Sequence, residues 1–354
     1  MNHQIIAISW NHLCTPIEFR DSLSLNWSEQ RHFLHFTLEG NSTVELVGLS
    51  TCNRVEFYAV SKSAQDVLSA IENIYTSMLK RDISWKQAKP KIYVGVEAFK
   101  HLCRVSVGME SMVIGEYQIL SQVKVVQKTV EQIQPKYESL IKLFSSAISN
   151  AEKIRNEISI GSGPTSISAL AVRKLVEIFG TLANKSVLIV GAGETATLTA
   201  ECLKNTGVSS FTIANRNEKN GIALAANIDG QYIHLEAIVN ELESCDIVIA
   251  ATNTRDFIVC KSQIESLMYT RKNSLTLLDI STPRNIDPSI RDIVNVDLFD
   301  LDHLHNTNIA EVCNDSESLE EAEKHIVELS KDMIDFLDSS YARRKELEYK
   351  EETH

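Results

Sequence analysis

The chain has 354 residues, more than a single hydrophobic core usually holds, so two or three domains are expected. Hydrophobic residues make up 44% and charged residues 23%, which excludes disordered and fibrous proteins. No apolar stretch reaches the length of a membrane span, and the N-terminus lacks a basic and apolar leader, so a cytoplasmic protein with no membrane partner is expected. The formal net charge of −12 is uneven, since residues 1–160 carry +1 and residues 301–354 carry −9. A polyanionic partner of the first segment is therefore not excluded, although no basic patch predicts one.

The seven cysteines are scattered, without CxxC pairs or His/Cys clusters at the spacing of metal ligands. In a reducing compartment they are expected to be free thiols, mostly structural. No metal site is predicted.

Residues 1–158 are expected to form an α+β domain. Strand-like composition occurs at residues 5–10, 44–48 and 55–60, and the segment from about 97 to 157 has helical spacing. Within it Gln118 and Gln122 are four residues apart, so they share one helix face.

Residues 159–304 are expected to form a second domain of a different class. A Gly-rich joint at residues 160–168 leads into a helix-like run, and then strands and helices alternate, with apolar strands at 246–252 and 275–281. This alternation is typical of a doubly wound parallel sheet of the Rossmann type.

Residues 305–354 are expected to form a third, helical segment. Its apolar positions repeat at intervals of three and four along an acidic helix, at Leu319, Ala322, Ile326, Leu329, Met333 and Phe336. The stripe lasts less than three heptads, which suffices to pack on a neighbour but is short for an independent coiled coil.

The second domain opens with a dinucleotide-binding fingerprint directly after a strand and before a helix. Gly191 permits a tight turn, Gly193 lets a pyrophosphate approach the backbone, and Ala196 allows close packing of helix on strand. A turn that merely needs two glycines is the weaker alternative. The fingerprint predicts cofactor contacts at Gly191, Ala192, Gly193, Glu194, Thr195 and Ala196.

The next strand indicates which dinucleotide is bound. A site for NAD usually ends this strand with an acidic residue that accepts from the ribose 2′-hydroxyl, whereas this strand ends with Asn215 and Arg216. An amide followed by a guanidinium suits a 2′-phosphate. NADPH is therefore the expected cofactor.

Cys52 lies in a polar interruption of a Val- and Phe-rich stretch, at Thr51-Cys52-Asn53-Arg54. A thiol reacts as its thiolate, which a nearby cation stabilises, and Arg54 is two residues away. Buried cysteines are nevertheless common and mostly inert, so spacing alone favours a structural thiol.

The sequence resembles the glutamyl-tRNA reductase family over roughly residues 5–305. The resemblance rests on STCNRVEFYAV (50–60), HLCRVSVGMESMVIGEYQILSQVK (101–124), VGAGETA (190–196), IANRN (213–217) and DISTPRNIDP (279–288). It implies reduction of glutamyl-tRNA(Glu) by NADPH to glutamate-1-semialdehyde, the first committed step of five-carbon tetrapyrrole biosynthesis. Cys52 would then be the nucleophile that forms an enzyme thioester.

The resemblance also implies roles for the residues around the thiol. His101 matches a histidine expected to perform acid/base catalysis, while His12 is equally consistent with bracing the cysteine loop. Substrate contacts are implied for Thr51, Asn53, Arg54, Ser111, Glu116, Tyr117, Gln118 and Gln122. Family members usually have Pro in place of Tyr117, so the turn there is expected to differ in detail.

The family forms dimers through a C-terminal helical domain, so the resemblance implies a homodimer, with residues 305–354 as a linker and a shortened dimerisation bundle. It also raises the question of direct transfer of the product to glutamate-1-semialdehyde aminomutase. Two alternatives stay open: an NADP-dependent dehydrogenase of a small acid, similar to shikimate dehydrogenase through the second domain only, and a non-catalytic paralogue that binds tRNA or a partner. The dehydrogenase would need no cysteine, and a binding module would have little need of Cys52, Arg54 and His101 together.

Overall fold

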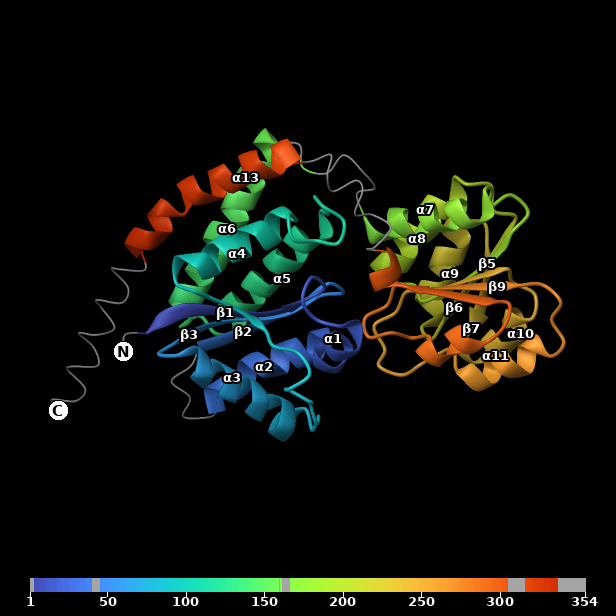
Figure 1. The fold of residues 1–354 in the computed structure, drawn as a ribbon, viewed down its shortest axis with the longest axis horizontal. Helices are drawn as coiled ribbons and strands as arrows, with labels where there is room; N and C mark the ends of the chain where they lie inside the picture. The colour runs from blue at the N-terminus through green and yellow to red at the C-terminus, as the bar shows by residue number, and fades with distance from the viewer. Residues whose placement is uncertain (1–2, 40–44, 159, 161–165, 305–315, 337–354) are drawn as a thin grey trace. The chain divides into compact units, whose positions relative to one another are not determined.

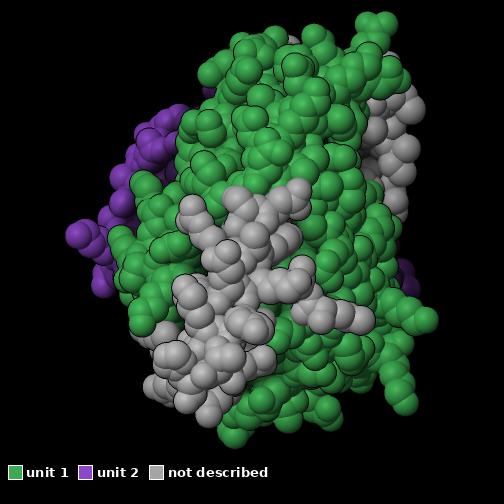
Figure 2. Space-filling view, turned by 90° about the vertical axis from the view of Figure 1, so that its left-hand side faces the viewer, with its two compact units in different colours: residues 1–163, 311–354 green, residues 164–310 purple. Residues whose placement is uncertain are grey.

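The computed structural model describes residues 3–39, 45–158, 160, 166–304 and 316–336, and the chain divides into two compact units (Figure 1). Unit 1 comprises residues 1–163 and 311–354, and unit 2 comprises residues 164–310. Figure 2 distinguishes them by colour, unit 1 in green and unit 2 in purple. The division falls inside the Gly-rich joint expected at residues 160–168, of which 161–165 lie outside the described residues.

Unit 1 is built on a four-stranded antiparallel sheet with the order β2-β3-β1-β4. The strands are β1 (Gln4–Asn11), β2 (Glu45–Ser50), β3 (Arg54–Ser61) and β4 (Lys91–Val94). Three of them lie where strand composition was seen in the sequence, and β4 was not anticipated. Asn11 pairs with Arg54 and Ser50 with Val55, so the end of β1 and the β2–β3 connection meet at one edge of the sheet.

Both faces of this sheet are covered by helices, so β1 and β3 are buried along nearly their whole length. Side chains of β1 alternate between two cores, with Ile5 and Ala7 in one and Ile6 and Ile8 in the other. Helices α4, α5 and α6 lie on one side of the sheet and α2 and α3 on the other (Figure 1). The helices of unit 1 are α1 (Ile17–Leu23), α2 (Trp27–Glu39), α3 (Ala64–Asn73), α4 (Val96–Val107), α5 (Gln118–Ile133), α6 (Glu138–Glu157) and α13 (Ser316–Leu329), with a π-helical turn at Ile74–Met78.

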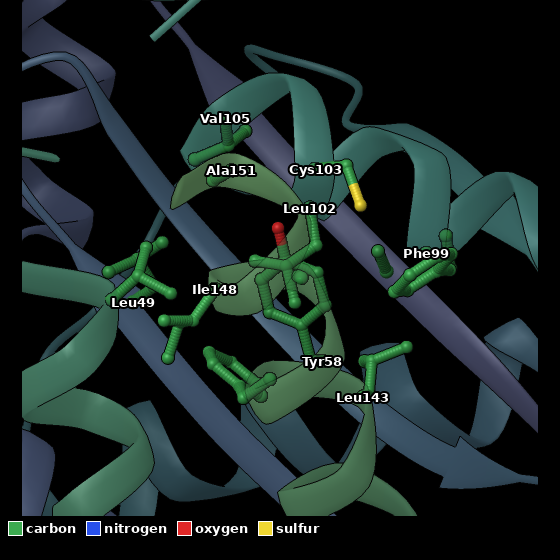
Figure 3. Close-up of a cluster of buried hydrophobic side chains, with 14 of the residues drawn as sticks. Leu49, Tyr58, Phe99, Leu102, Cys103, Val105, Leu143, Ile148 and Ala151 are labelled. Carbon is green, nitrogen blue, oxygen red and sulfur yellow. The ribbon is translucent and has the colours of Figure 1, made fainter. Parts of the chain in front are cut away.

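Tyr58 of β3 lies in the first of these cores, among side chains from α4 and α6 that include Leu102, Leu143 and Ile148 (Figure 3). Cys103 belongs to the same cluster and is fully buried. Burial raises the pKa of its thiol to about 12, so Cys103 is a protonated, packed side chain, as its expected structural role requires.

The C-terminal helix α13 belongs to unit 1, where it packs on other helices of that unit. Ala322, Ile326 and Met333 are buried in the core formed by α4 and α6. Arg104 of α4 donates to Glu323 of α13, with Nε 2.8 Å from Oε2. The described part of the apolar stripe therefore packs within the subunit, because α4 and α6 offer it an apolar surface. Residues 305–315 and 337–354 lie outside the described residues.

Unit 2 contains a six-stranded parallel sheet with the order β10-β9-β8-β5-β6-β7, the doubly wound arrangement expected from the sequence. Its strands are β5 (Ser186–Val190), β6 (Ser210–Asn215), β7 (Gln231–His234), β8 (Ile247–Ala250), β9 (Leu275–Asp279) and β10 (Val296–Asp300). Its helices are α7 (Ile167–Phe179), α8 (Glu194–Lys204), α9 (Glu218–Asn227), α10 (Ile238–Leu242) and α11 (Lys261–Met268), with 3-10 turns at Leu235–Ala237 and Pro288–Asp292. The strand order reverses at β5, where crevices for ligands form in such sheets.

Candidate functional site

Cys52 lies in the tight connection between β2 and β3. The backbone N–H of Thr51 donates to the carbonyl of Arg54 at 2.9 Å, and the N–H of Asn53 donates to Oγ1 of Thr51 at 3.2 Å. The polar interruption seen in the sequence is thus a hairpin turn. The hydroxyl group of Thr51 stabilises the turn by accepting a hydrogen bond from the backbone. The turn presents the half-buried Cys52 at the sheet edge.

Two elements from outside the hairpin hold this turn. The N–H of His12, just after β1, donates to the carbonyl of Asn53 at 2.9 Å, and Nη1 of the buried Arg20 donates to the carbonyl of Cys52 at 3.1 Å. His12 therefore braces the cysteine loop through its backbone, which favours the structural alternative for this residue. Arg20 was not singled out in the sequence.

The thiol of Cys52 is protonated in the resting protein. Burial, and after it the negative charge of Glu116, raise its pKa to about 12, although Arg20 and Arg54 act in the opposite direction. A nearby arginine was expected to favour the thiolate. Arg54 does act in this direction, but desolvation and a carboxylate outweigh the cations, so the net pKa is raised.

Arg54 belongs to a buried network of charges centred on Glu56. Arg54 Nη1 and His101 Nε2 both lie 3.0 Å from Oε1 of Glu56, and the hydroxyl groups of Ser9 and Tyr58 donate to the same carboxylate. The two cations hold the pKa of Glu56 well below its usual range despite full burial. Glu56 is thus an ionised carboxylate that accepts four hydrogen bonds.

The imidazole ring of His101 contacts two carboxylates and an aromatic ring. Its Nδ1 lies 3.3 Å from Oε1 of Glu110, its Nε2 contacts Glu56, and the Tyr93 ring stacks on it with centroids 4.1 Å apart. The carboxylates overcome the effect of burial and raise the pKa of His101 to about 9. The near-neutral pKa expected for an acid/base catalyst is therefore wrong, because a histidine between two carboxylates keeps its proton.

Arg54 and Asn53, at the cysteine turn, each have one buried polar atom without a hydrogen-bond partner. Nε of Arg54 and Oδ1 of Asn53 are buried without a hydrogen-bond partner, although Nη2 of Arg54 donates to the carbonyl of Glu110 at 2.5 Å. Buried polar atoms normally have partners, so such atoms beside a thiol are candidates for contact with a bound molecule. Nε of Arg54 is therefore a donor available to a ligand.

The second block of expected substrate contacts forms a loop at residues 108–117 that leads into α5. The N–H of Gly115 closes it by donating to the carbonyl of Gly108 at 3.1 Å. Ser111 and Glu116 are buried, Gln118 is half-buried at the start of α5, and Gln122 and Tyr117 are exposed. The loop adjoins the cysteine turn through two links already described, the bond from Arg54 to Glu110 and the charge of Glu116 on the thiol.

Arg155 of α6 fixes the end of this loop and was missed in the sequence. Its guanidinium donates to the carbonyls of Gly115, at 3.2 Å, and Glu116, at 2.5 Å. Glu56 and Glu110 were missed as well. A sequence signal existed for Glu56, since Arg54, Glu56 and Tyr58 alternate along β3 and so face the same way, but nothing marked that face as buried.

The dinucleotide fingerprint lines a cleft of about 460 Å³ in unit 2, at the carboxyl ends of β5, β6 and β8. Gly191 has φ +116°, and a Cβ there would lie 2.4 Å from the carbonyl oxygen of Ala251. A Cβ on Gly193 would meet nothing within 4 Å, so the start of α8 is open to a ligand. The conformation and the space both fit a bound pyrophosphate.

The expected cofactor residues divide into two groups. Gly191, Ala192, Gly193, Asn215 and Arg216 line the cleft. Glu194, Thr195 and Ala196 do not: Glu194 is exposed, Ala196 is buried in the first turn of α8, and the carbonyl of Thr195 accepts from Ser168 and Thr199. The remaining lining residues are Ala214, Asn217, Asn220, Leu235, Thr252, Asn253, Thr254 and Ile258.

The far wall of the cleft is held by buried Asp279 at the end of β9. Its carboxylate accepts from the backbone N–H groups of Asn285 and Ile286, both at 2.8 Å, and from that of Ser281 at 3.0 Å. Burial is the largest influence and raises its pKa to about 6. Asn285 in turn contacts Thr252, which lines the cleft, so Asp279 shapes the site from behind.

Within the described ranges, no cluster of three His, Cys, Asp or Glu side chains could hold a metal ion. A search of the same residues found no helix with the length and apolarity of a membrane span.

Comparison with known proteins assigns a family model to each unit. The model for the N-terminal domain of glutamyl-tRNA(Glu) reductase matches residues 8–158, and the shikimate/quinate 5-dehydrogenase model matches residues 173–307. The glutamyl-tRNA reductase of Macrococcus caseolyticus is 35% identical over 311 residues, which cover 87% of this chain and 70% of that protein. The one of Staphylococcus haemolyticus is 36% identical over 300 residues, or 84% and 67% of the two chains. Among solved structures, glutamyl-tRNA reductase from Methanopyrus kandleri aligns with a TM-score of 0.51 and 25% identity, covering 96% of this chain and 82% of that one.

Proposed function

The chain belongs to the glutamyl-tRNA reductase family, and from this premise we propose that it reduces glutamyl-tRNA(Glu) with NADPH to glutamate-1-semialdehyde through a thioester on Cys52. The observation that carries the proposal is the cysteine turn. It presents one thiol beside two buried polar atoms that lack partners, Nε of Arg54 and Oδ1 of Asn53. A structural thiol would have no need of such neighbours.

The first chemical step is acyl transfer to sulfur. The sulfur of Cys52 bonds to the glutamyl carbonyl carbon, the bond from that carbon to the ribose oxygen breaks, and the tRNA leaves with a free hydroxyl group. Because the thiol is protonated at rest, its proton must leave during attack. Glu116 is the strongest electrostatic neighbour of the thiol, and we assign it as the proton acceptor, from which the proton passes to the leaving ribose oxygen.

The glutamyl group would be held by the two loops described above. Arg54 Nε donates to a carboxylate of the substrate, and Asn53 Oδ1 accepts from its ammonium group. Thr51, Ser111, Tyr117, Gln118 and Gln122 complete the proposed set of contacts. His101 is a positioning residue in this account, since its proton and that of Arg54 keep Glu56 ionised and fix the end of β3.

The cleft of unit 2 would hold NADPH, whose hydride would reduce the thioester to the aldehyde as NADP⁺ forms. Cys52 would leave as its thiolate and take up a proton from water. Gly191, Ala192 and Gly193 would hold its pyrophosphate. Asn215 and Arg216 would hold the 2′-phosphate, since Arg216 is exposed and none of the described residues that line the cleft is acidic. Glu194, Thr195 and Ala196 would support the turn from outside the cleft.

Incubation with glutamyl-tRNA and NADPH tests the proposal directly, with semialdehyde as the readout and Cys52→Ser as the control. An NADP-dependent dehydrogenase of a small acid is the second candidate, favoured by the match of the shikimate/quinate 5-dehydrogenase model to unit 2. That activity would use no thiol, so it would survive in the Cys52→Ser variant. Semialdehyde from the wild type alone supports the reductase.

The proposal extends to assembly and location. A homodimer has support in the exposed apolar side chains of Val327 and Ile334, on the outer side of the C-terminal helical region. Sedimentation velocity would show a single subunit mass if the proposed dimer is absent. A cytoplasmic location follows from the substrate, since charged tRNA occurs there, and transfer to glutamate-1-semialdehyde aminomutase would protect the reactive aldehyde.

A further inference from the structure

Tyr117 is an exposed aromatic residue in a substrate loop. It is 66% exposed, although it follows the buried Glu116 and directly precedes α5. Exposure alone does not mark a binding residue, but Tyr is enriched at binding surfaces because its ring is apolar and its hydroxyl group is polar. The family usually has Pro here, so the family's known contacts do not account for the ring.

Arg155 holds this ring in place. Its guanidinium carbon lies 4.5 Å from the centre of the Tyr117 ring, while its nitrogens donate to the carbonyls of Gly115 and Glu116. The cation therefore covers one face of the ring and fixes the backbone on which the ring is mounted. Because two-thirds of Tyr117 is exposed, its ring also offers a flat surface to solvent. Arg155 fixes the orientation of this ring before any ligand binds.

The position of the ring relative to the chemistry follows from its neighbours. Glu116, the residue before it, is the strongest electrostatic neighbour of the Cys52 thiol, and the same loop is bonded to Arg54 through the carbonyl of Glu110. In an aminoacyl-tRNA the ester lies on the ribose of the terminal adenosine. Wherever the thiol meets the ester carbon, the adenine is therefore only one ribose ring away.

We propose that Tyr117, backed by Arg155, stacks on the terminal adenine of glutamyl-tRNA and thereby places the ester at Cys52. The inference rests on the proposed function and names the part of the substrate that this edge of unit 1 recognises. Aromatic stacking is the usual way in which proteins hold an unpaired base, and it requires no base-edge hydrogen bonds. Arg155 adds its positive charge close to the polyanion.

The test compares Cys52 acylation, without NADPH, by glutamyl-tRNA and by a glutamyl ester of a simple alcohol. Tyr117→Leu is expected to lower the ratio of the two rates about tenfold, within the range for loss of one stacked base, whereas Tyr117→Phe keeps it. The matched control is Tyr269→Leu in unit 2, which removes a tyrosine that is 90% exposed and leaves the ratio unchanged.

A second readout reports stacking itself. With 2-aminopurine in place of the terminal adenine, fluorescence is expected to be quenched on binding to the wild type and Tyr117→Phe and restored with Tyr117→Leu. An unchanged rate ratio and unchanged quenching in Tyr117→Leu would overturn the inference while leaving the reductase proposal intact. Absence of acylation of the wild type by either ester would instead overturn the proposed function.

Discussion

His101 and Glu56 form a fully buried ion pair, with Nε2 of the histidine 3.0 Å from Oε1 of the glutamate. The glutamate also accepts from Arg54, the residue two positions after the Cys52 thiol. Three charged groups from α4 and β3 therefore fix the end of the strand that carries the cysteine turn. The pair links the stability of unit 1 to the geometry of its candidate active site.

This pair predicts a loss of stability at alkaline pH. The pKa of His101 is raised from 6.5 to about 9 on folding, so its contribution is complete below pH 6.5 and is lost as the pH rises through about 9. The free energy of unfolding is expected to fall between pH 7 and 9.5, by an amount on the order of 3 kcal/mol. Urea titrations at a series of pH values would measure it. The fall should be much smaller in His101→Asn, where the buried thiols with raised pKa, such as Cys52 and Cys103, still contribute above about pH 8.5. It should persist in full in His325→Asn, which removes a histidine nearer the surface that also contacts a carboxylate; equal falls in all three proteins would refute the assignment.

Cys52 is expected to resist alkylation near neutral pH in the absence of substrate. Its pKa of about 12 leaves little thiolate, so the rate of modification by iodoacetamide should still be rising at pH 11. Removing the negative charge beside the thiol, in Glu116→Gln, should lower this pKa and speed alkylation at a fixed pH of 8. Mass spectrometry of the Cys52 peptide measures the rate, with the peptide of the exposed Cys14 as an internal control. A plateau below pH 9 in the wild type would show that the thiol is activated in the free enzyme.

Two glycines of the cofactor loop should respond differently to the same substitution. In Gly191→Ala the new Cβ would lie 2.4 Å from the carbonyl oxygen of Ala251, and φ is +116°, so unit 2 should lose roughly 1–3 kcal/mol or more of stability. In Gly193→Ala the Cβ meets no atom, so folding is preserved while the approach of a phosphate is narrowed. Thermal unfolding and NADPH titration separate the two effects. Equal stabilities for the two variants would contradict this account of the turn.

Arg216 is expected to determine the preference for NADPH. Arg216→Asp places a carboxylate where the cleft has none, which repels a 2′-phosphate and can accept from a 2′-hydroxyl. The ratio of kcat/KM values for NADPH and NADH should fall by at least about tenfold, the equivalent of 1.4 kcal/mol. Lys272→Asp makes the same charge change at an exposed residue of unit 2 that precedes β9, at the opposite end of the strands from the cleft, and serves as the matched control. An unchanged ratio in the Arg216 variant would remove the basis for choosing NADPH.

The fold was largely predictable because its patterns are local. The alternation of apolar strands and helices gave the parallel sheet of unit 2, and the spacing along α4, α5 and α6 gave their helices. Strand β4 was missed because Lys91–Val94 is short and mostly exposed, so it lacks the apolar signature of a buried strand. The partner of α13 was also not predictable, since an apolar stripe fits a helix of the same subunit as well as one of another.

The site was less predictable, because its charges are set by contacts distant in sequence. The pKa of His101 depends on Glu56, 45 positions away, and on Glu110. Spacing placed Glu56 on the same face of β3 as Arg54 but did not show that this face is buried, and it did not mark Glu110. The clamp of Arg155 on residues 115 and 116 likewise joins segments about 40 positions apart. The sequence predicted which kinds of residue form the site. Their protonation states could not be predicted, because they depend on contacts that form only in three dimensions.

The central claim is that Cys52 carries the glutamyl group. Incubation with glutamyl-tRNA labelled in its glutamate, without NADPH, tests it most directly, because the thioester should then accumulate. The account predicts label on the wild-type protein that is released by hydroxylamine and by added NADPH, and no label on Cys52→Ser. Binding of the tRNA with no label on the wild type, or equal label on the Cys52→Ser variant, would contradict it.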